Sequence, residues 1–358
     1  ELVSDLDFDT NGDGQMNELD TYWNDGEGWK PIGSFYSPFS ADFHGNGHQI
    51  RNLYIDKSGS IGLFSYITGT PDRPATITQV AIIGPLTSIT DRMTFSTGIN
   101  DAGILVARVS HAEIDSIFVT GVVDSPAHSG GLAAQASNSA ITNIFSSAAA
   151  LTGNNQGGLI GYLSRSTLSN SLSTGYADSD SGLLNHSDRS NNESLYWAIN
   201  TSGQTTSAGT NASYFGALLS ELQCPTTANN NTCTDKGSLY ENWNSEVWDF
   251  GTEQQLPALI MGNRIYRDSD GDGVLDKNDA FPDNFAASID IDGDRAPDRW
   301  TTGCDAICTE QSELTFDAFP SSAAAHLDGD LDGLVDEWAD DCDVNCQANS
   351  GLTFDDYA

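Results

Sequence analysis

The stretch "GGLIGYLSRSTLSNSLSTG", residues 157 to 175, joins a glycine and an apolar pair to a short strand-like alternation of apolar and polar residues. An apolar pair also follows Gly62, Gly103, Gly131 and Gly182, and the later copies lie 28, 27 and 24 residues apart (103 to 131, 131 to 158, 158 to 182). This spacing suits one coil of a solenoid whose coils hydrogen-bond to their neighbours. We therefore predict a mainly β fold built as a β-solenoid.

The strands that follow these glycines place amide side chains at equivalent positions. Gln79, Asn143 and Asn170 match one another, and Asn52 in the earlier "IRNLYI" matches them as well. We expect a ladder of stacked amides that rises roughly 4.8 Å per coil. Its role would be structural rather than catalytic.

Residues 26–265 resemble the bacterial GLUG-repeat proteins, named for glycine-leucine-any-glycine motifs such as "GLIG". "FSADFHGNGHQIRNLYI" resembles the opening coil of that family, and its His44 and His48 are interpreted as turn residues rather than metal ligands. "ESLYWAINTSGQTTSAG" and "VWDFGTEQQLPAL" resemble its closing segment. The resemblance implies a right-handed β-helix of the kind found in large secreted surface proteins, adhesins and some immunoglobulin A peptidases. The zinc signature HExxH of such a peptidase is absent from the sequence.

The C-terminal part repeats an aspartate pattern. "DSDGDGVLD", "DIDGDRAPD" and "DGDLDGLVD" place Asp at relative positions 1, 3, 5 and 9. Alternate carboxylates on a tightly turning loop point to one centre, where a position-7 carbonyl completes an oxygen shell that suits calcium better than magnesium. The predicted ligands are Asp268, Asp270, Asp272, Val274, Asp276 and Asp279; then Asp290, Asp292, Asp294, Ala296, Asp298 and Asp317; then Asp328, Asp330, Asp332, Leu334, Asp336 and Asp355.

Residues 266–358 resemble thrombospondin type 3 repeats in the "DxDGDGxxD" core and the "DAFP" close. The second and third copies depart from that family by an insert that carries a cysteine pair. Asp305 or Asp343 could therefore close these loops instead of Asp317 and Asp355. A disordered acidic tail is the alternative, but Trp, Phe and Leu at fixed offsets favour a small hydrophobic filling.

Residues 1–25 contain "DTNGDGQMNELD", which fits the twelve-position calcium loop with Gly14 at the sharp turn. The segments on both sides are expected to form short helices, so the unit resembles a single EF-hand or half of a dockerin. A loop without metal is the alternative. With the three later loops, the sequence predicts about four calcium ions. The predicted ligands here are Asp9, Asn11, Asp13, Gln15, Asn17 and Asp20.

Cysteines and charge indicate the compartment. The six cysteines form three close pairs, which predict local disulfides and an oxidising, extracellular location. A zinc site is the weaker alternative, because histidines are lacking near the CxxxC pairs.

With 51 acidic and 14 basic residues, the formal charge of -37 disfavours nucleic acid and anionic membrane as partners. No apolar run reaches the roughly 18 residues of a membrane span, and the chain starts without a leader, as a processed or excised piece would. The cysteine pairs for which a disulfide is predicted are Cys224 with Cys233, Cys304 with Cys308 and Cys342 with Cys346.

These features predict a calcium-stabilised, secreted or cell-surface structural or adhesive protein, a segment or subunit of a bacterial adhesin, matrix or filament. Its partners would be calcium, surface glycans or like subunits assembled head to tail. Two alternatives remain. A carbohydrate-active β-helix enzyme would need basic residues for a lyase or a carboxyl pair for a hydrolase, for which Glu113 and Asp115 offer only weak support, and we assign no catalytic residue. A glycan-binding module would use exposed aromatics, of which the candidates are Tyr22, Trp23, Trp29, Tyr36 and Tyr162.

Overall fold

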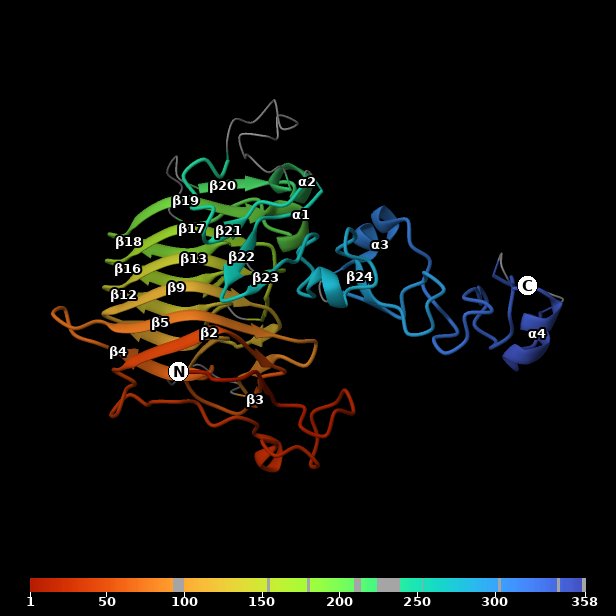
Figure 1. Ribbon diagram of the computed structural model, residues 1–358, viewed down its shortest axis with the longest axis horizontal. Helices are drawn as coiled ribbons and strands as arrows, with labels where there is room; N and C mark the ends of the chain where they lie inside the picture. The colour runs from red at the N-terminus through yellow and green to blue at the C-terminus, as the bar shows by residue number, and fades with distance from the viewer. Residues whose placement is uncertain are drawn as a thin grey trace. The chain divides into compact units, whose positions relative to one another are not determined.

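The computed structural model divides the chain into two compact units, Glu1–Val274 and Leu275–Ala358 (Figure 1). The structure describes residues 1–92, 100–152, 155–178, 181–208, 214–223, 239–252, 254–301, 304–339 and 342–355. Each unit is described separately below.

Within these residues, the first unit contains four parallel sheets, and Figure 1 shows the strands of the long sheet lying one above another. The long sheet contains β1 (Leu6–Asp7), β2 (Asp42–Arg51), β5 (Ala75–Ile83), β9 (Ala112–Val119), β13 (Ala140–Ser146), β17 (Thr167–Ser173), β19 (Asn191–Ala198) and β20 (Tyr214–Ala217). The second sheet contains β3 (Tyr54–Asp56), β6 (Ser88–Thr90), β10 (Val122–Asp124) and β14 (Ala149–Leu151). The third sheet contains β7 (Asp101–Gly103), β11 (His128–Gly130) and β15 (Asn155–Gly157). The fourth sheet contains β4 (Phe64–Thr68), β8 (Val106–Ser110), β12 (Ala133–Ser137), β16 (Ile160–Ser164) and β18 (Leu184–Asp188).

The chain visits the four sheets in a fixed order. It passes through β5, β6, β7 and β8, returns to the long sheet as β9, and repeats the circuit through β10, β11 and β12 and then from β13 to β16. Parallel strands need long connections, and here each connection is the rest of the circuit. The expected mainly β fold with long parallel sheets is confirmed.

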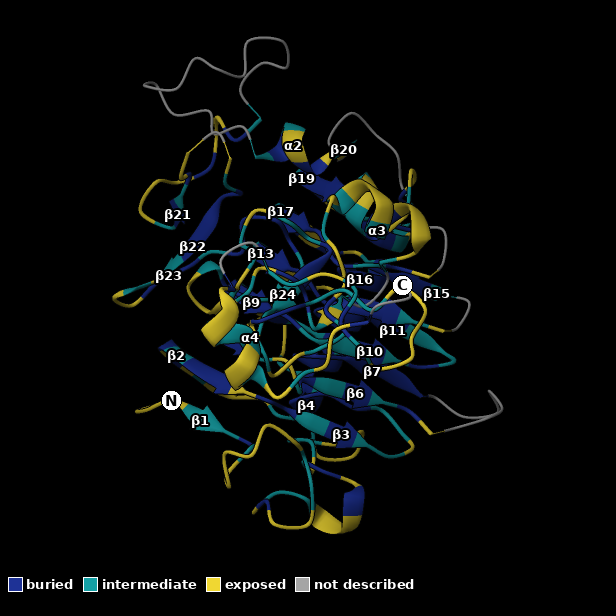
Figure 2. Cartoon of the chain, turned by 90° about the vertical axis from the view of Figure 1, so that its right-hand side faces the viewer, coloured by how far each residue is buried: buried dark blue, intermediate teal, exposed yellow. Residues whose placement is uncertain are grey.

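Apolar side chains from successive circuits form columns between the sheets. Because the strands pair in register, each buried residue stacks on its counterpart one circuit away, and the column excludes water along its length. Figure 2 shows these strands as largely buried. On the long sheet the column contains Ile77, Ile114, Ile141 and Leu168, and on the fourth sheet it contains Phe64, Val106, Ala133, Ile160 and Leu184.

A second column consists of residues in the left-handed backbone conformation. Asn143 has a φ of 55° and lies between the register pairs Thr142–Asp115 and Ile144–Ile117, which places it opposite Ser116. Asn adopts this conformation at lower cost than most residues, because its short amide bonds locally. The column contains Gln79, Ser116, Asn143, Asn170 and Ser194, with φ values of 53°, 57°, 55°, 48° and 54°.

The predicted equivalence of Gln79, Asn143 and Asn170 is therefore confirmed, but the assignment of Asn52 to the column is wrong. Asn52 follows β2, and its amide donates to Asp7 at 2.8 Å. The predicted ladder had the amides stacking on one another. The amide of Asn143 instead donates a hydrogen bond to Asp115 at 2.7 Å and accepts one from the Trp248 indole at 3.0 Å.

An antiparallel sheet covers the outer face of the long sheet. It contains β21 (Trp248–Asp249), β22 (Ala258–Met261) and β23 (Arg264–Tyr266). The Tyr266 hydroxyl donates to the Gly47 carbonyl at 2.7 Å, and its ring lies 5.9 Å from that of Phe118. Phe118 and Phe145 lie outside the inner core yet are fully buried. The second halves of the central strands β5, β9, β13 and β17 are thus buried on both faces, whereas their first halves alternate between buried and more exposed residues. Short helices complete this unit: α1 (Ile199–Ser202), α2 (Leu219–Leu222) and the 3₁₀ helix η1 (Asn24–Gly26).

The second unit has little apolar interior. It contains the antiparallel pair β24 (Ala287–Ile289) and β25 (Arg299–Trp300), the helices α3 (Ala306–Ser312) and α4 (Val344–Ser350), and the 3₁₀ helix η2 (Asp276–Asn278). Figure 2 shows both α-helices as largely exposed. Equivalent ring pairs recur in its two longer repeats, with ring centroids 6.0 Å apart for Trp300–Phe316 and 6.2 Å apart for Trp338–Phe354. The sequence repeat is therefore also a structural repeat.

The left-handed column can be tested at Asn143. Asn143→Val and Asn143→Gly both remove the bonds to Asp115 and Trp248, but only valine is strained at positive φ. We expect the valine variant to be less stable than the glycine variant by about 1–2 kcal/mol. Urea unfolding measures the difference, and equal stability of the two variants would contradict the assignment.

Candidate metal centres

Four aspartate-rich loops share one pattern of backbone hydrogen bonds. In each loop the carboxylate of the first-position Asp accepts two backbone N–H groups through its two oxygens, which bends the chain around it. Asp9 accepts from Gly12 at 2.8 Å and Gly14 at 3.0 Å, and Asp268 accepts from Gly271 at 2.7 Å and Gly273 at 3.0 Å. Asp290 accepts from Gly293 at 2.7 Å and Arg295 at 2.9 Å, and Asp328 accepts from Asp332 at 3.1 Å and Gly333 at 2.9 Å.

In the Asp residues at positions 3 and 5, one carboxylate oxygen accepts a hydrogen bond from a backbone N–H group. Asp292 and Asp294 each accept the N–H two residues further on, at 3.3 and 2.8 Å. The other oxygen of each carboxylate is buried and makes no hydrogen bond, although that of Asp294 lies 3.4 Å from His326 Nδ1. Asp270 and Asp272 in the first repeat, and Asp330 and Asp332 in the third, make the same forward bonds.

Carboxylate oxygens gather within 4.8 Å of one another in all three C-terminal loops. Positive φ at positions 4 and 6 of each loop permits this convergence, and glycine supplies it except at Leu331 (62°) and Arg295 (73°). The clusters are Asp268–Asp270–Asp272, Asp290–Asp292–Asp294, Asp328–Asp330–Asp332 and Asp330–Asp336–Asp355.

The second repeat has its position-9 and closing aspartates near the cluster as well. Asp317 is 1% exposed, and burial, together with the charges of Asp294, Asp292 and Asp298, raises its pKa to about 6. Burial and the Asp294 charge also raise the pKa of Asp292. Buried oxygens of Asp298 and Asp317 lack hydrogen-bond partners. This is the fit expected of a multivalent hard cation, because only a cation or protons can offset such a cluster.

The third repeat closes in the same way. Asp355 is buried beside Asp330 and Asp336, and its backbone N–H donates to the Val335 carbonyl at 2.9 Å. Asp336 uses one oxygen to accept the Gly329 N–H at 2.6 Å, and its other oxygen is buried without a hydrogen-bond partner. Burial and the neighbouring acidic charges, Asp332 first among them, raise the pKa of Asp330.

The alternative closing residues serve another purpose. Asp305 caps α3 by accepting the N–H groups of Ile307 and Cys308, both at 3.0 Å. Asp343 caps α4 in the same way, through Asn345 and Cys346, both at 2.9 Å. The structure thus places Asp317 and Asp355 with the clusters and uses Asp305 and Asp343 at helix ends.

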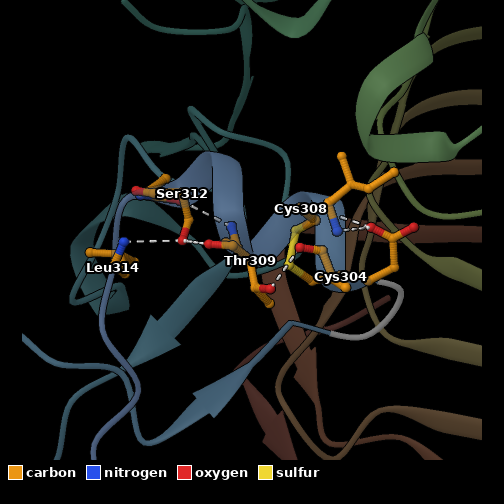
Figure 3. The surroundings of a disulfide bond; sticks show 10 residues. Cys304, Cys308, Thr309, Ser312 and Leu314 are labelled. Carbon is orange, nitrogen blue, oxygen red and sulfur yellow. Dashed lines mark hydrogen bonds between the residues drawn. A yellow bond between two sulfur atoms is a disulfide. The ribbon is translucent and has the colours of Figure 1, made fainter. Parts of the chain in front are cut away.

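Two of the predicted disulfides are present. Cys304 bonds to Cys308 (Figure 3), and Cys342 bonds to Cys346, so each insert is a helical turn closed by a disulfide. At the end of α3, the Ser312 hydroxyl makes two hydrogen bonds. It donates to the Thr309 carbonyl at 2.7 Å and accepts from the Leu314 N–H at 3.1 Å. The predicted pair Cys224–Cys233 lies outside the described residues.

The start of the first repeat is docked onto the parallel sheets. Asp268 and Asp270 are fully buried, and the Thr174 hydroxyl, just after β17, donates to the Gly271 carbonyl at 3.1 Å. The Gln223 side chain also donates to the Ser269 carbonyl at 2.8 Å. Sequence reasoning missed this contact, because Thr174 and Gly271 lie far apart in the chain.

The remaining ligands predicted for this repeat belong to the second unit. Asp276 is the first residue of η2. Asp279 accepts a hydrogen bond from the Phe281 N–H at 2.7 Å. In the second repeat, Asp317 accepts one from the Phe319 N–H at the same distance. The "DAF" segments of the first two repeats therefore adopt the same local turn.

The N-terminal loop departs from the predicted EF-hand unit. Its flanks are not helices, because Leu6–Asp7 pairs as β1 with β2, and the segment after the loop forms turns up to η1. Asp20 is buried and accepts the N–H groups of Thr10, Asn11 and Asn17 at 2.7, 3.3 and 2.9 Å. Burial alone would raise its pKa, but these bonds lower it. Asp20 thus clamps the loop ends, while the Asn11 and Asn17 amides donate to Asp13 at 3.1 and 2.8 Å.

The histidines of "HGNGH" have structural contacts. His44 Nδ1 lies 2.9 Å from the Thr78 hydroxyl, and His48 Nδ1 lies 3.0 Å from the Asp5 carboxylate. Asp5 also accepts two bonds from Arg264, at 2.8 and 2.9 Å, which joins the N-terminal segment to β23. Both histidines therefore have structural contacts, but they lie within β2, on either side of its register irregularity, and the interpretation of them as turn residues is wrong.

The geometry defines a mainly β chain with carboxylate clusters that could hold metal ions. The chain is 32% identical over 118 residues to "Halomucin" of Haloquadratum walsbyi, a match that covers 32% of this chain and 1% of that protein. The chain thus matches a very small part of its relative. No family model and no solved structure matches it. Among the described residues, no helix has the length and apolar character needed to cross a membrane.

The closing role of Asp317 can be separated from the capping role of Asp305. Asp317→Asn should weaken cation binding by the second repeat, because it removes a buried charge from the cluster. Asp305→Asn keeps a side-chain oxygen at the helix cap and should leave cation binding unchanged. Calorimetric titration with calcium measures both variants, and the opposite ranking would contradict the ligand assignment.

Proposed function

We propose that the chain is a calcium-stabilised extracellular protein with a structural or adhesive role. The observation that carries the proposal is the hydrogen-bond pattern shared by four loops. In the second repeat this pattern leaves several buried carboxylate oxygens without a hydrogen bond, and in the third repeat it leaves one, on Asp336. Calcium prefers six to eight oxygen ligands in a flexible shell, and carboxylate-rich loops with a backbone carbonyl supply them.

The proposed content is about four calcium ions, one for each loop. The C-terminal repeats would use the clustered carboxylates with the position-7 carbonyls of Val274, Ala296 and Leu334. The N-terminal loop would use Asp9, Asn11 and Asp13 with the Gln15 carbonyl. Because Asp20 is already engaged by three N–H groups, we place this loop last in affinity.

The proposed architecture follows the resemblances in the sequence. The four parallel sheets and their fixed order of visits support a right-handed β-helix of GLUG type over residues 26–265, preceded by the calcium loop of residues 1–25. The recurring Asp clusters and Trp–Phe pairs support thrombospondin type 3-like repeats over residues 266–358. Such a chain would serve as a segment or subunit of a surface adhesin, matrix or filament.

Two further observations support the extracellular location. Disulfides persist in oxidising compartments, and two are present in the second unit. The formal charge of -37 also suits surroundings that supply cations.

Calcium would act as a folding ligand in the second unit. Its buried apolar side chains are mostly small, such as Ala286, Ala287 and Ala325, and cannot offset the entropy of an ordered chain. Binding to the folded loops stabilises them by mass action, so the unit becomes more rigid as calcium rises.

A chelator should therefore act selectively on the two units. Residues 275–358 should become sensitive to protease after calcium removal, because their carboxylates then repel one another unopposed. The strands from β5 to β17 should resist, since their backbone groups pair with neighbouring strands and their columns are apolar. Limited proteolysis followed by peptide mass spectrometry locates the cuts. Equal resistance with and without chelator would contradict a folding role for calcium.

The oxidising location predicts three local disulfides, including the pair Cys224–Cys233. Mass spectrometry of unreduced peptides should show these links and no free thiol. A link between Cys304 and Cys342, or free thiols throughout, would remove this support for secretion.

A further inference from the structure

One outward-facing row of side chains crosses the fourth sheet. Tyr66, Arg108, Gln135, Tyr162 and His186 are register partners on β4, β8, β12, β16 and β18. On β4, β8, β12 and β16 the neighbours of these residues along the strand are buried, so the row faces away from the core. At about 4.8 Å between strands, the row extends for roughly 19 Å.

Two exposed aromatic rings extend this row beyond β4. Phe35 is 62% exposed and Tyr36 is 94% exposed. The Phe35 ring lies 5.8 Å from that of Tyr66 and 5.2 Å from that of Tyr36. Ser34 and Ser37 close the turn that carries them, and Gly33 passes so close to the Tyr66 carbonyl that a Cβ would lie 2.6 Å from it. The turn is therefore held against the row.

The middle of the row carries a polar network. Asp101, on β7 of the third sheet, is 1% exposed and pairs with the Arg108 guanidinium. The Gln135 amide donates to Asp101 at 3.2 Å and lies 3.3 Å from His128 Nδ1. These contacts fix the orientation of Arg108 and Gln135, and both residues stay partly exposed.

The far end of the row is aromatic again. The Tyr162 and His186 rings stack with centroids 4.8 Å apart and an interplanar angle of 6°, and His128 meets Tyr162 edge-on at 6.3 Å. The strip, which we define as Phe35, Tyr36, Tyr66, Arg108, Gln135, Tyr162 and His186, thus has aromatic ends and a hydrogen-bonding centre.

We propose that the strip binds a linear, uncharged glycan laid across the strands. Sugar rings have apolar C–H faces, which stack on aromatic side chains, and hydroxyl edges, which hydrogen-bond to amide, imidazole and guanidinium groups. The strip supplies both kinds of group along one line long enough for several linked sugars. Its large exposed aromatics are the feature that packing alone does not explain, because Tyr36 contributes almost nothing to the core.

The electrostatics favour an uncharged ligand. The cation of the strip, Arg108, is already paired with the buried Asp101. A polyanion would therefore have to displace Asp101 and approach a chain of formal charge -37. This inference does not rest on the calcium proposal, because none of the strip residues belongs to an aspartate loop.

The experiment is calorimetric titration of the full chain, in calcium, with linear oligosaccharides of glucose, mannose, galactose and N-acetylglucosamine. We expect at least one to bind. Tyr36→Ala and Tyr162→Ala should each weaken that binding roughly ten-fold, the loss expected when a stacking ring is removed. Tyr162→Phe keeps the ring and should retain most of the affinity.

Tyr176→Ala is the matched control, since Tyr176 is a half-buried tyrosine outside the fourth sheet and should not affect binding. Because Tyr36 is almost fully exposed, its replacement tests the strip without disturbing the fold, which circular dichroism can verify. Three results would each overturn the proposal: no binding of any neutral oligosaccharide, binding that is unchanged in Tyr36→Ala and Tyr162→Ala, or binding of acidic polysaccharides alone.

Discussion

Backbone hydrogen bonding between successive circuits of the chain, in one fixed register, is the constraint on which the first unit depends. A residue on one circuit must adopt the backbone conformation of its partner on the next, or the pairing on both sides of it is lost. This explains why left-handed residues form a column through Ser116, Asn143 and Asn170. It also explains why Ile114, Ile141 and Leu168 stack, since a change of face at one level would expose an apolar residue.

The aspartate loops depend on a different constraint. Hydrogen bonds from the backbone to the carboxylates fix the shape of each loop, and this shape brings the same negatively charged groups close together. The first-position Asp accepts two N–H groups and so fixes the turn, and this turn then aims the carboxylates at positions 3 and 5 to one point. Two such charges about 4 Å apart repel by roughly 4 kcal/mol at an effective dielectric constant of about 20. The pKa of Asp317 is raised first by its burial and then by this repulsion from Asp294, Asp292 and Asp298. Hydrogen bonds alone leave this cost uncompensated, and either protonation of the carboxylates or a bound cation would offset it.

Sequence reasoning succeeded where the repeat itself determines the geometry. The equivalence of Gln79, Asn143 and Asn170 follows from the period, and the positions of Asp317 and Asp355 follow from the repeated "LTFD" segments. Asn52 was misplaced because "IRN" is similar to "ITN" in sequence, whereas the register pairs Ile50 with Ile82 and sets Asn52 beyond the end of β2. The N-terminal flanks were predicted as helices because an isolated segment gives no sign that Leu6–Asp7 will add to the edge of a sheet.

The rest could not be read from local patterns, because it depends on contacts between residues far apart in the chain. Trp248 reaches Asn143, and Thr174 reaches Gly271, only after the circuits have stacked. The strip arises in the same way, since residues about one circuit apart in the sequence become neighbours in a row. Stacking brings side chains at equivalent positions to regular intervals, but Tyr66, Arg108, Gln135, Tyr162 and His186 differ in chemistry. The backbone alone therefore sets the spacing of the row, while the side chains at its positions can differ from strand to strand, as the proposed glycan strip requires.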